Sequence, residues 1–459
     1  MIKKNKLFGN LLSKYDDLEF SKLNSISFRC VIDDSLIKSK NIVKHESEKT
    51  LHFIWIGIPD DKVYLYLRVW SHHYPDYDIN LWIDSKFLYA NYYKSKVRAG
   101  FKRKKLIDIL KMQDSNYEVY NKNNLGNDAL DSLIESKFNK RFHGKESKDS
   151  IIQCLKQKYD FLNILDIRKN KVILNHKLEK YYEKEIVLRA NIAAASDILR
   201  LCILKKYGGV YLDVDTLPCL DYVFKKSNRY VDIEIANNEF VEIYKSQLYL
   251  DKFNNSYSNN EISLSLEAVK KSLQAMRDIY FDNEKINYYL ELIQCDINEH
   301  DIVKVNSTPF MLHEKLLMFG SSKTKLNTFY NNVLACDKNS SVVSIILKEI
   351  CKRYDHIEKN EYDKWYSVNK YNDLYGKGSM ERLIGYRLDG FANIPNSTVI
   401  LTGPCMILEV YLSITYKIFR IKSNIDPRKV AAVYQAKNNG ICCCNITTFT
   451  LENSKSTWM

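Results

Sequence analysis

Proline and glycine are scarce in this chain of 459 residues, which contains 7 and 14 of them respectively. Because these residues dominate turns and interrupt regular structure, their scarcity excludes a collagen-like or low-complexity chain and predicts long helices. Hydrophobic residues make up 45% and charged residues 27%, the balance of a globular protein with a large buried core. The length predicts two or three domains, or one elaborated α/β unit.

Long hydrophobic runs are also lacking. The most apolar stretch, TVILTGPCMILEVYLSITY at 398–416, contains Gly403-Pro404 and Glu409, so we do not expect it to span a membrane. The basic N-terminal stretch MIKKNKLFGNLLSKYDD has no continuous apolar segment, which argues against a Sec signal peptide. A secreted form of this chain would therefore use another route.

Paired cysteine motifs are absent. None of the eleven cysteines belongs to a CxxC pair, and the triplet Cys442-Cys443-Cys444 has the wrong spacing for a tetrahedral zinc site. An odd number of scattered cysteines in a long chain indicates a reducing compartment, such as the cytosol of a cell or of a host.

Acidic residues are too few to balance the basic ones, and the formal net charge is +13. A basic protein favours anionic partners. The densest basic run, KSKVRAGFKRKK at 94–105, is interpreted first as a solvated helix face, with an anionic membrane surface or an acidic partner as the alternative. No nucleic-acid recognition signature accompanies the charge, so we expect no nucleic-acid partner.

Apolar runs and their periodicity predict an α/β fold. The stretch LHFIWIGIP at 51–59 has the pattern of a buried strand, and 63–84 that of a helix followed by a second strand. NIAAASDILRLCILKKYGG at 191–209 is predicted to be a helix capped by its terminal glycines, with VYLDVD as the next strand. Alternating strands and helices indicate a sheet with crossover connections.

Other regions are predicted to lie outside this core. Short helices are expected over 1–50, which we treat as a separate N-terminal region that contacts a membrane or partner. The remainder, 51–459, would form one domain. Its charged and polar segments predict helical insertions at about 85–190 and 221–320.

The stretch YGGVYLDVDTLPCL ends an apolar strand on two aspartates, Asp213 and Asp215. Residues two apart in a strand point to the same face, so both carboxylates are expected to project from the strand's carboxyl end, where α/β sheets bind ligands. A divalent cation relieves the repulsion between them, and hard oxygen ligands suit Mn²⁺ or Mg²⁺. We therefore expect a metal that bridges to a diphosphate and neutralises the leaving group.

Two other interpretations of this stretch stay open. The aspartates could be a solvated strand end with one capping carboxylate. A phosphatase of the haloacid-dehalogenase type also ends an apolar strand on DxDx[TV], but Leu217 stands at the final position here.

The preceding helix places a further charged pair on one face, because Asp197 and Arg200 are three residues apart. They could form a salt bridge without a function. Alternatively, carboxylate and guanidinium together could hold sugar hydroxyls, which both donate and accept hydrogen bonds.

At these residues the sequence resembles a known family. AAASDILR followed by GGVYLDVD is similar to the catalytic domain of the large clostridial glucosylating toxins. These are retaining glycosyltransferases of the GT-A fold that transfer a sugar from a UDP-sugar to small GTPases. The resemblance therefore implies a GT-A, Rossmann-like nucleotide-sugar-binding core with large helical insertions. It covers 51–84 and 190–220 well and 330–459 in patches.

The resemblance also implies roles for individual residues. Trp55 in LHFIWIG matches the tryptophan that stacks on uracil, and Asn331 in YNNVLACDKNS matches an asparagine that contacts the sugar or diphosphate. Ser456 and Trp458 in STW match a mobile C-terminal lid, expected at about 445–459, where the serine helps to hold the metal and the tryptophan contacts the diphosphate. Tyr211 in VYLDVD is expected in the same donor-binding site. The catalytic set implied is Asp197, Arg200, Asn331 and Trp458; donor binding adds Trp55, Tyr211, Asp213 and Ser456; the metal ligands are Asp213, Asp215 and Ser456.

Some positions depart from the family pattern. The family has a glutamate three residues before the lid serine, whereas this chain has Asn453, with Glu452 beside it. The chain ends at Met459, where the toxins continue, so we expect either a shortened form of a larger toxin or a stand-alone effector. Tyr330 and Asn332 flank Asn331, and the bulk of the tyrosine favours UDP-glucose over UDP-GlcNAc as donor.

The expected function is transfer of a hexose to a hydroxyl of a host protein, with a Rho- or Ras-type small GTPase as the favoured acceptor, in the host cytosol and at the inner membrane surface. The alternatives are transfer to arginine, a glycan or a lipid, or a GT-A fold without activity that serves as a binding module. Because every matched position except that of Asn453 is retained, we favour the enzyme.

Overall fold

A computed structural model describes most of the chain. The described residues are 44–101, 105–123, 126–141, 147–170, 173–230, 238–255, 266–274, 283–302, 308–313, 316–322, 325, 327–370, 380–388, 397–418, 421–436, 442–443 and 446–451. The predicted helices of 1–43 and the predicted lid residues 452–459, including Ser456 and Trp458, lie outside this set.

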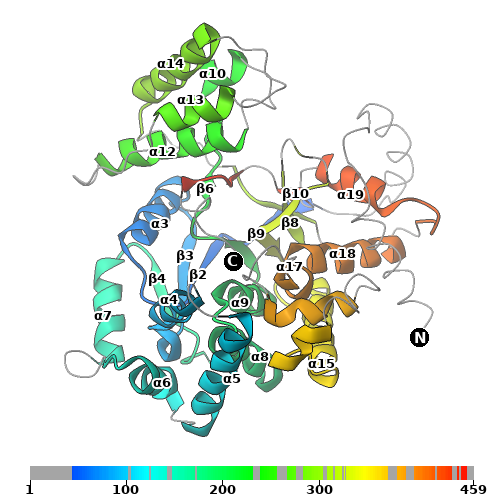
Figure 1. Ribbon diagram of the computed structural model, residues 1–459. Helices are drawn as coiled ribbons and strands as arrows, with labels where there is room; N and C mark the ends of the chain where they lie inside the picture. Colours follow the sequence, from blue (N-terminus) through cyan, green and yellow to red (C-terminus); the bar gives the residue numbers. More distant parts are fainter. Residues whose placement is uncertain are drawn as a thin grey trace.

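Short strands in the first half of the described chain are separated by single helices or by runs of helices (Figure 1). The strands are β1 (Lys44–Glu46), β2 (Thr50–Trp55), β3 (Asp78–Ile83), β4 (Asn163–Asp166), β5 (Gly209–Leu212), β6 (Leu217–Pro218), β7 (Met311–His313), β8 (Met318–Ser321), β9 (Phe329–Cys336), β10 (Cys442–Cys443) and β11 (Ile446–Thr447). The helices up to the middle of the chain are α3 (Asp61–His73), α4 (Ala90–Phe101), α5 (Leu106–Asn123), α6 (Ala129–Phe138), α7 (Lys148–Lys158), α8 (His176–Val187) and α9 (Ile192–Tyr207). They are followed by α10 (Lys225–Tyr230), α12 (Glu239–Asn255), α13 (Leu266–Gln274), α14 (Asn283–Glu299), α15 (Ser341–Lys359), α17 (Ser397–Leu401), α18 (Pro404–Ile418) and α19 (Pro427–Ala436).

A seven-stranded mixed sheet runs through the centre in the order β10-β8-β9-β5-β2-β3-β4. The strands β5, β2, β3 and β4 are parallel to one another, whereas β9 pairs antiparallel with both β5 and β8. Parallel neighbours require crossover connections, and α3 supplies the one between β2 and β3. The carboxyl ends of β2, β3 and β5 therefore meet at one edge of the sheet.

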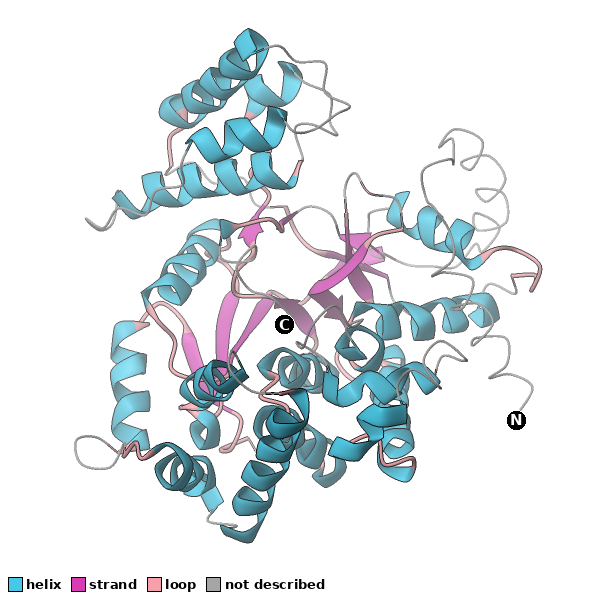
Figure 2. Cartoon of the chain, in the orientation of Figure 1, coloured by secondary structure: helices cyan, strands magenta, loops and turns pink. Residues whose placement is uncertain are grey.

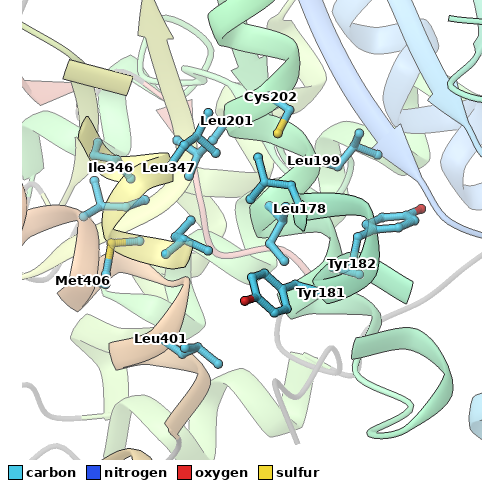
Figure 3. Close-up of a cluster of buried hydrophobic side chains, with 14 of the residues drawn as sticks. Leu178, Tyr181, Tyr182, Leu199, Leu201, Cys202, Ile346, Leu347, Leu401 and Met406 are labelled. Carbon is cyan, nitrogen blue, oxygen red and sulfur yellow. The ribbon is translucent and has the colours of Figure 1, made fainter. Parts of the chain in front are cut away.

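Both faces of the sheet are buried, and the alternation of side chains assigns them to two cores. On one face, Tyr211, Leu334 and Cys336 pack with helices α8, α9, α15 and α18. Figure 3 shows part of this core, where Tyr181 of α8, Leu201 of α9 and Ile346 of α15 come together. The residues that face the other core from β5 and β9 are Val210, Leu212, Val333 and Ala335. The second core includes side chains from α3, α7, α12 and α14.

The segment between β6 and β7 is helical, as predicted for most of 221–320. Helices α10, α12, α13 and α14 pack on one another and stand apart from the central sheet (Figures 1 and 2). The strand β8, which begins at Met318 close to the expected end of this range, belongs to the central sheet.

Two predictions about regular structure are wrong. The segment 85–190 is not wholly an insertion, since Asn163–Asp166 form β4 and complete the sheet beside β3. This strand was missed because only Ile164 and Leu165 are apolar in its four residues, NILD, too few for a pattern. At the N-terminal end of the described chain, Lys44–Glu46 form a strand paired with Met311–His313 and not a helix.

One stretch among the described residues, Ser397–Lys417, has the length and apolar composition of a helix that could cross a membrane. In the structure this stretch comprises α17 and α18, and 67% of its most apolar window is buried inside the fold. The apolar composition is accounted for by this burial, because a core helix needs the same residues.

Candidate functional site

A cavity of about 310 Å³ lies at the carboxyl ends of β2 and β5, where an α/β sheet is expected to bind ligands. Trp55 and Ile56 close it at the end of β2, and Asp213, Val214 and Asp215 border it after β5. The start of α3 and one face each of α4 and α9 supply the remaining walls. They contribute Asp60, Lys62, Val63 and Tyr66 from the α3 side, Asn91 and Lys94 from α4, and Ile192, Ala193, Ser196 and Arg200 from α9.

Helix α9 forms as predicted and carries the predicted charged pair. Its first turn is capped by Asn191, whose side chain accepts a hydrogen bond from the Ala194 amide. It ends at Gly208, which has a φ of 73° and donates its amide to Leu204 O. A Cβ at Gly208 would lie 2.7 Å from Lys338 N, so glycine is required both for the backbone angle and for the close approach of the chain after β9.

Asp197 is fully buried and does not border the cavity. Its Oδ1 accepts a 2.8 Å hydrogen bond from Asn331 Nδ2 and lies 3.2 Å from Arg200 Nη2, while its Oδ2 accepts a 2.9 Å hydrogen bond from Thr402 Oγ1. Burial raises the pKa of this carboxyl to about 6, against the opposing effects of Arg200, Thr402 and Asn331. In this arrangement the carboxylate fixes other groups of the site, and direct contact with sugar hydroxyls stays a prediction.

Arg200 joins three parts of the site. Its guanidinium lies 3.2 Å from Asp213 Oδ1, donates a 2.6 Å hydrogen bond to Asn331 O and lies 4.4 Å from the centre of the Tyr211 ring. Burial lowers the pKa of Arg200, but Asp213, Tyr211 and Asp197 outweigh it and hold the pKa above its ordinary value. The side chain is therefore a permanent cation held between two carboxylates at the cavity wall.

The paired aspartates occupy a turn and not the strand itself, which corrects our prediction. Strand β5 ends at Leu212, and Asp213 O accepts hydrogen bonds from the amide and the hydroxyl of Thr216. These bonds turn the chain after Asp213, so the strand rule does not set the direction of the two side chains. Both residues nonetheless border the cavity at the carboxyl end of β5, as expected.

Tyr211 fixes the first of the two carboxylates. Its hydroxyl donates a 2.6 Å hydrogen bond to Asp213 Oδ1, the oxygen that also faces Arg200. The tyrosine is buried, and burial raises its pKa, so the hydroxyl remains a donor at all ordinary pH values. Tyr211, Arg200 and Asp213 therefore form one connected polar group at the edge of the cavity.

A C-terminal segment lies directly against the aspartate turn. Strand β11 pairs antiparallel with β6, and Thr450 Oγ1 donates a 2.7 Å hydrogen bond to Asp215 O. Phe449 packs edge-on against Tyr330, the residue before Asn331, with 6.2 Å between the ring centres. We call Ile446–Leu451 the C-terminal strap. The predicted lid residues Glu452, Asn453, Ser456 and Trp458 follow the strap and lie outside the described residues.

The aspartates have the chemistry of a divalent metal site. Carboxylate oxygens are hard ligands that suit Mn²⁺ or Mg²⁺, and the Asp213 side chain is 22% exposed in a residue that lines the cavity. Within the part of the chain that the structure describes, no group of three or more His, Cys, Asp and Glu side chains gathers for a metal. A metal at the aspartates would therefore need ligands from outside the described side chains.

The structure brings most of the predicted site residues together. Trp55, Arg200, Tyr211, Asp213 and Asp215 border the cavity, whereas Asp197 and Asn331 lie behind Arg200. The indole nitrogen of Trp55 is buried and has no hydrogen-bond partner among the described residues.

Sequence reasoning missed three further groups of this site. Ser196 precedes Arg200 by one helical turn, so its place on the cavity face follows from the helix period. Thr402, which holds Asp197, immediately precedes Gly403-Pro404 in a stretch that was considered only for its apolar composition. Lys94 lines the cavity although it begins the basic run 94–105, which was interpreted as a surface feature.

Comparison with known proteins identifies the family of this chain and its fold. The chain matches the TcdA/TcdB catalytic glycosyltransferase domain over residues 49–159 and 98–376. It therefore belongs to that family, and its fold is the GT-A fold, as predicted.

Individual relatives are distant and longer. Toxin A of Clostridium novyi is 25% identical over 95% of this chain and 21% of its own length, and Toxin B of Clostridioides difficile is 22% identical over 94% and 19%. This chain thus spans about a fifth of the length of the curated relatives it matches. Among solved structures, the catalytic domain of alpha-toxin from Clostridium novyi matches with a TM-score of 0.65 at 20% identity, over 99% of this chain and 88% of that one. The UDP-bound glycosyltransferase domain from the YGT toxin matches with a TM-score of 0.53 at 20% identity, over 90% and 82%.

Proposed function

We propose that this protein is a retaining glycosyltransferase that transfers a hexose from a UDP-sugar to a hydroxyl group of a host protein. The observation that carries the proposal is the connected group Arg200–Asp213–Tyr211, which is held from behind by Asp197 and borders a cavity that Trp55 also lines. An aromatic platform at one end and paired carboxylates at the other suit a nucleoside diphosphate. Membership of the catalytic glycosyltransferase family supports the same conclusion.

In this proposal, some residues bind the nucleotide and others stabilise the diphosphate leaving group. Trp55 would stack on the uracil, while Asp213 and Asp215, together with Ser456, would hold a Mn²⁺ or Mg²⁺ ion. Such an ion, when bound, would neutralise charge on the departing diphosphate. Arg200 would remain fixed by Asp197 and Asn331 and add a second, permanent positive charge beside the diphosphate.

Retention of configuration is proposed to occur by attack from the face of the leaving group. A double displacement needs an exposed carboxylate beneath the anomeric carbon. Asp197 is buried and has hydrogen bonds or ion pairs on both oxygens, which leaves it unsuited to that role. Catalysis would then depend on positioning the acceptor and on stabilising the diphosphate, with Trp458 at the lid.

UDP-glucose is proposed as the donor in preference to UDP-GlcNAc. Tyr330 and Asn332 flank Asn331, and neither borders the cavity. A Cβ at Gly320 would come within 2.7 Å of Asn332 Oδ1, so the Asn332 amide packs against β8 and opens no space toward the sugar. Tyr330 packs against Phe449 of the C-terminal strap, and its bulk beside Asn331 is the feature that favours glucose over a sugar with a larger substituent.

We propose a small GTPase of the Rho or Ras type as acceptor, in the cytosol of a host cell. The relatives named Toxin A and Toxin B support a toxin role. The test is incubation of the protein with Mn²⁺ and each UDP-sugar, with and without a panel of GTPases, followed by mass spectrometry of the GTPase. We expect a single added hexose from UDP-glucose on at least one GTPase. Transfer to arginine, or to a glycan or lipid only, would contradict the proposed acceptor, and no release of UDP from any donor would contradict the activity.

A further inference from the structure

Lys94 is a cation of the cavity whose charge is not neutralised by any described residue. It lies on α4, is half-buried and lines the cavity, yet it makes no hydrogen bond or ion pair with the residues that the structure describes. Burial, with a smaller effect of Arg98, lowers its pKa to about 8, so the ammonium stays charged at neutral pH. Arg200, in contrast, is held between Asp197 and Asp213.

The order of the strands places the strand that leads to α4 and Lys94 on the far side of β2 from the strand that leads to the aspartates. In the sheet, β2 lies between β5, which leads to Asp213, and β3, which leads through a short turn to α4. One turn before Lys94, the Asn91 side chain lies against Gly57, where a Cβ would be 2.5 Å from Asn91 Nδ2. The cavity face of α4 therefore lies at the end of β2, beyond Trp55.

We propose that Lys94 binds the uridine half of the donor nucleotide, by donating a hydrogen bond from its ammonium to an oxygen of the nucleoside. This inference rests on the proposed function, because it takes the diphosphate to lie at the aspartates. With the diphosphate there, the nucleoside extends past Trp55 to α4. A lysine ammonium only donates, and the carbonyl and hydroxyl oxygens of uridine are acceptors. Charge-assisted hydrogen bonds of this kind are stronger than neutral ones.

Lys94→Met removes the charge and keeps a stem of similar length, and it is the variant we would test. Lys96→Met is the matched control, because Lys96 is exposed on the same helix and does not border the cavity. The ligands are uridine, UDP and inorganic pyrophosphate, each titrated in the presence of Mn²⁺ by calorimetry. Thermal unfolding of both variants reports whether the fold is retained.

Lys94→Met is expected to weaken the binding of uridine and of UDP by the same factor, about tenfold. The binding of pyrophosphate should be unchanged. Lys96→Met is expected to leave all three affinities unchanged. Weaker binding of UDP and pyrophosphate with uridine unaffected would place the lysine on the phosphates and overturn the inference, as would no change with any ligand. If the wild-type protein binds neither UDP nor uridine, the proposed function fails and the inference fails with it. If the wild type binds UDP and uridine and Lys94→Met binds them equally well, the inference about Lys94 is wrong while the proposed function stands.

Discussion

Asn331 and Asp197 lie 134 positions apart in the chain, and the Asn331 amide donates a 2.8 Å hydrogen bond to the buried Asp197 carboxylate. The backbone oxygen of the same asparagine accepts a hydrogen bond from Arg200. This one residue of β9 therefore fixes both members of the charged pair on α9. Arg200 in turn faces Asp213, so the asparagine is linked to the aspartate turn through a single side chain.

Asn331→Leu should reduce turnover and stability together. The substitution removes the amide donor and leaves Asp197 buried with one fewer partner, a loss of about 1–3 kcal/mol in the free energy of unfolding. We expect UDP release to fall by at least about tenfold, because Asp197, which faces Arg200, is no longer held by the Asn331 amide. Denaturant unfolding and steady-state kinetics check both effects. Unchanged kinetics in a folded variant would show that the link to Asp197 has no role in turnover.

Arg200→Lys should lower turnover strongly, although the substitution keeps the positive charge. The guanidinium contacts Asp213, Asp197 and Asn331 O at once, and a lysine ammonium cannot reach this planar set. We expect a fall in kcat of about 100-fold, measured as UDP release at saturating donor. Activity within a few-fold of wild type would mean that only the charge matters.

Activity should fall below pH 6 through Asp197. Its pKa is about 6 in the folded chain against an ordinary value of 3.8, so the folded protein binds a proton between these two pH values that the unfolded chain does not. The stability contributed by this group is therefore present at low pH and lost as the pH rises through 6. Turnover has the opposite dependence, because protonation removes the charge that faces Arg200.

The measurement is the pH profile of kcat/KM for UDP release, with Asp197→Asn beside the wild type. For the wild type, we expect kcat/KM to fall about tenfold at one pH unit below the pKa of Asp197. The variant should be slow and show no pH dependence over the same range. A wild-type profile that stays flat from pH 7 to pH 5 is incompatible with this role for the carboxylate.

Thr450→Val should weaken metal binding without unfolding the protein. The substitution keeps the side-chain shape but removes the hydrogen bond from the C-terminal strap to Asp215 O. We expect the Mn²⁺ concentration for half-maximal binding, followed by titration in the presence of UDP, to rise several-fold. Thr415→Val is a matched control, because Thr415 is equally buried and its hydroxyl donates to Tyr411 O within α18, away from the site. If Thr450→Val and Thr415→Val bind Mn²⁺ with equal affinity, the C-terminal strap has no role in holding Asp215 for the metal.

Much of the site could be predicted from short local patterns. Helix α9 and its glycine cap follow from an apolar stripe and a terminal Gly-Gly pair, and both were confirmed. The position of the aspartates at the carboxyl end of β5 was also confirmed, but not their presence in a turn, which depends on the hydrogen bonds of Thr216 to Asp213 O.

The rest depends on contacts between distant parts of the chain. Burial of Asp197 behind Arg200 requires Asn331 and Thr402, which approach α9 only in the folded protein. Lys94 belongs to a run of basic residues, and composition alone does not separate the one that faces the cavity from its exposed neighbours. Strand β4 has too few apolar residues to show a period, so its place in the sheet is determined by pairing with β3.

The most direct test of the proposed function compares wild type with the double variant Asp213→Asn, Asp215→Asn in Mn²⁺-dependent UDP release from UDP-glucose. The substitutions remove two charges with little change in volume, so the fold should persist, as shown by an unchanged circular dichroism spectrum. We predict that the wild type releases UDP and that the double variant is inactive even at saturating Mn²⁺. Near wild-type release by the double variant in saturating Mn²⁺ would contradict the assignment of these aspartates as the metal and diphosphate site.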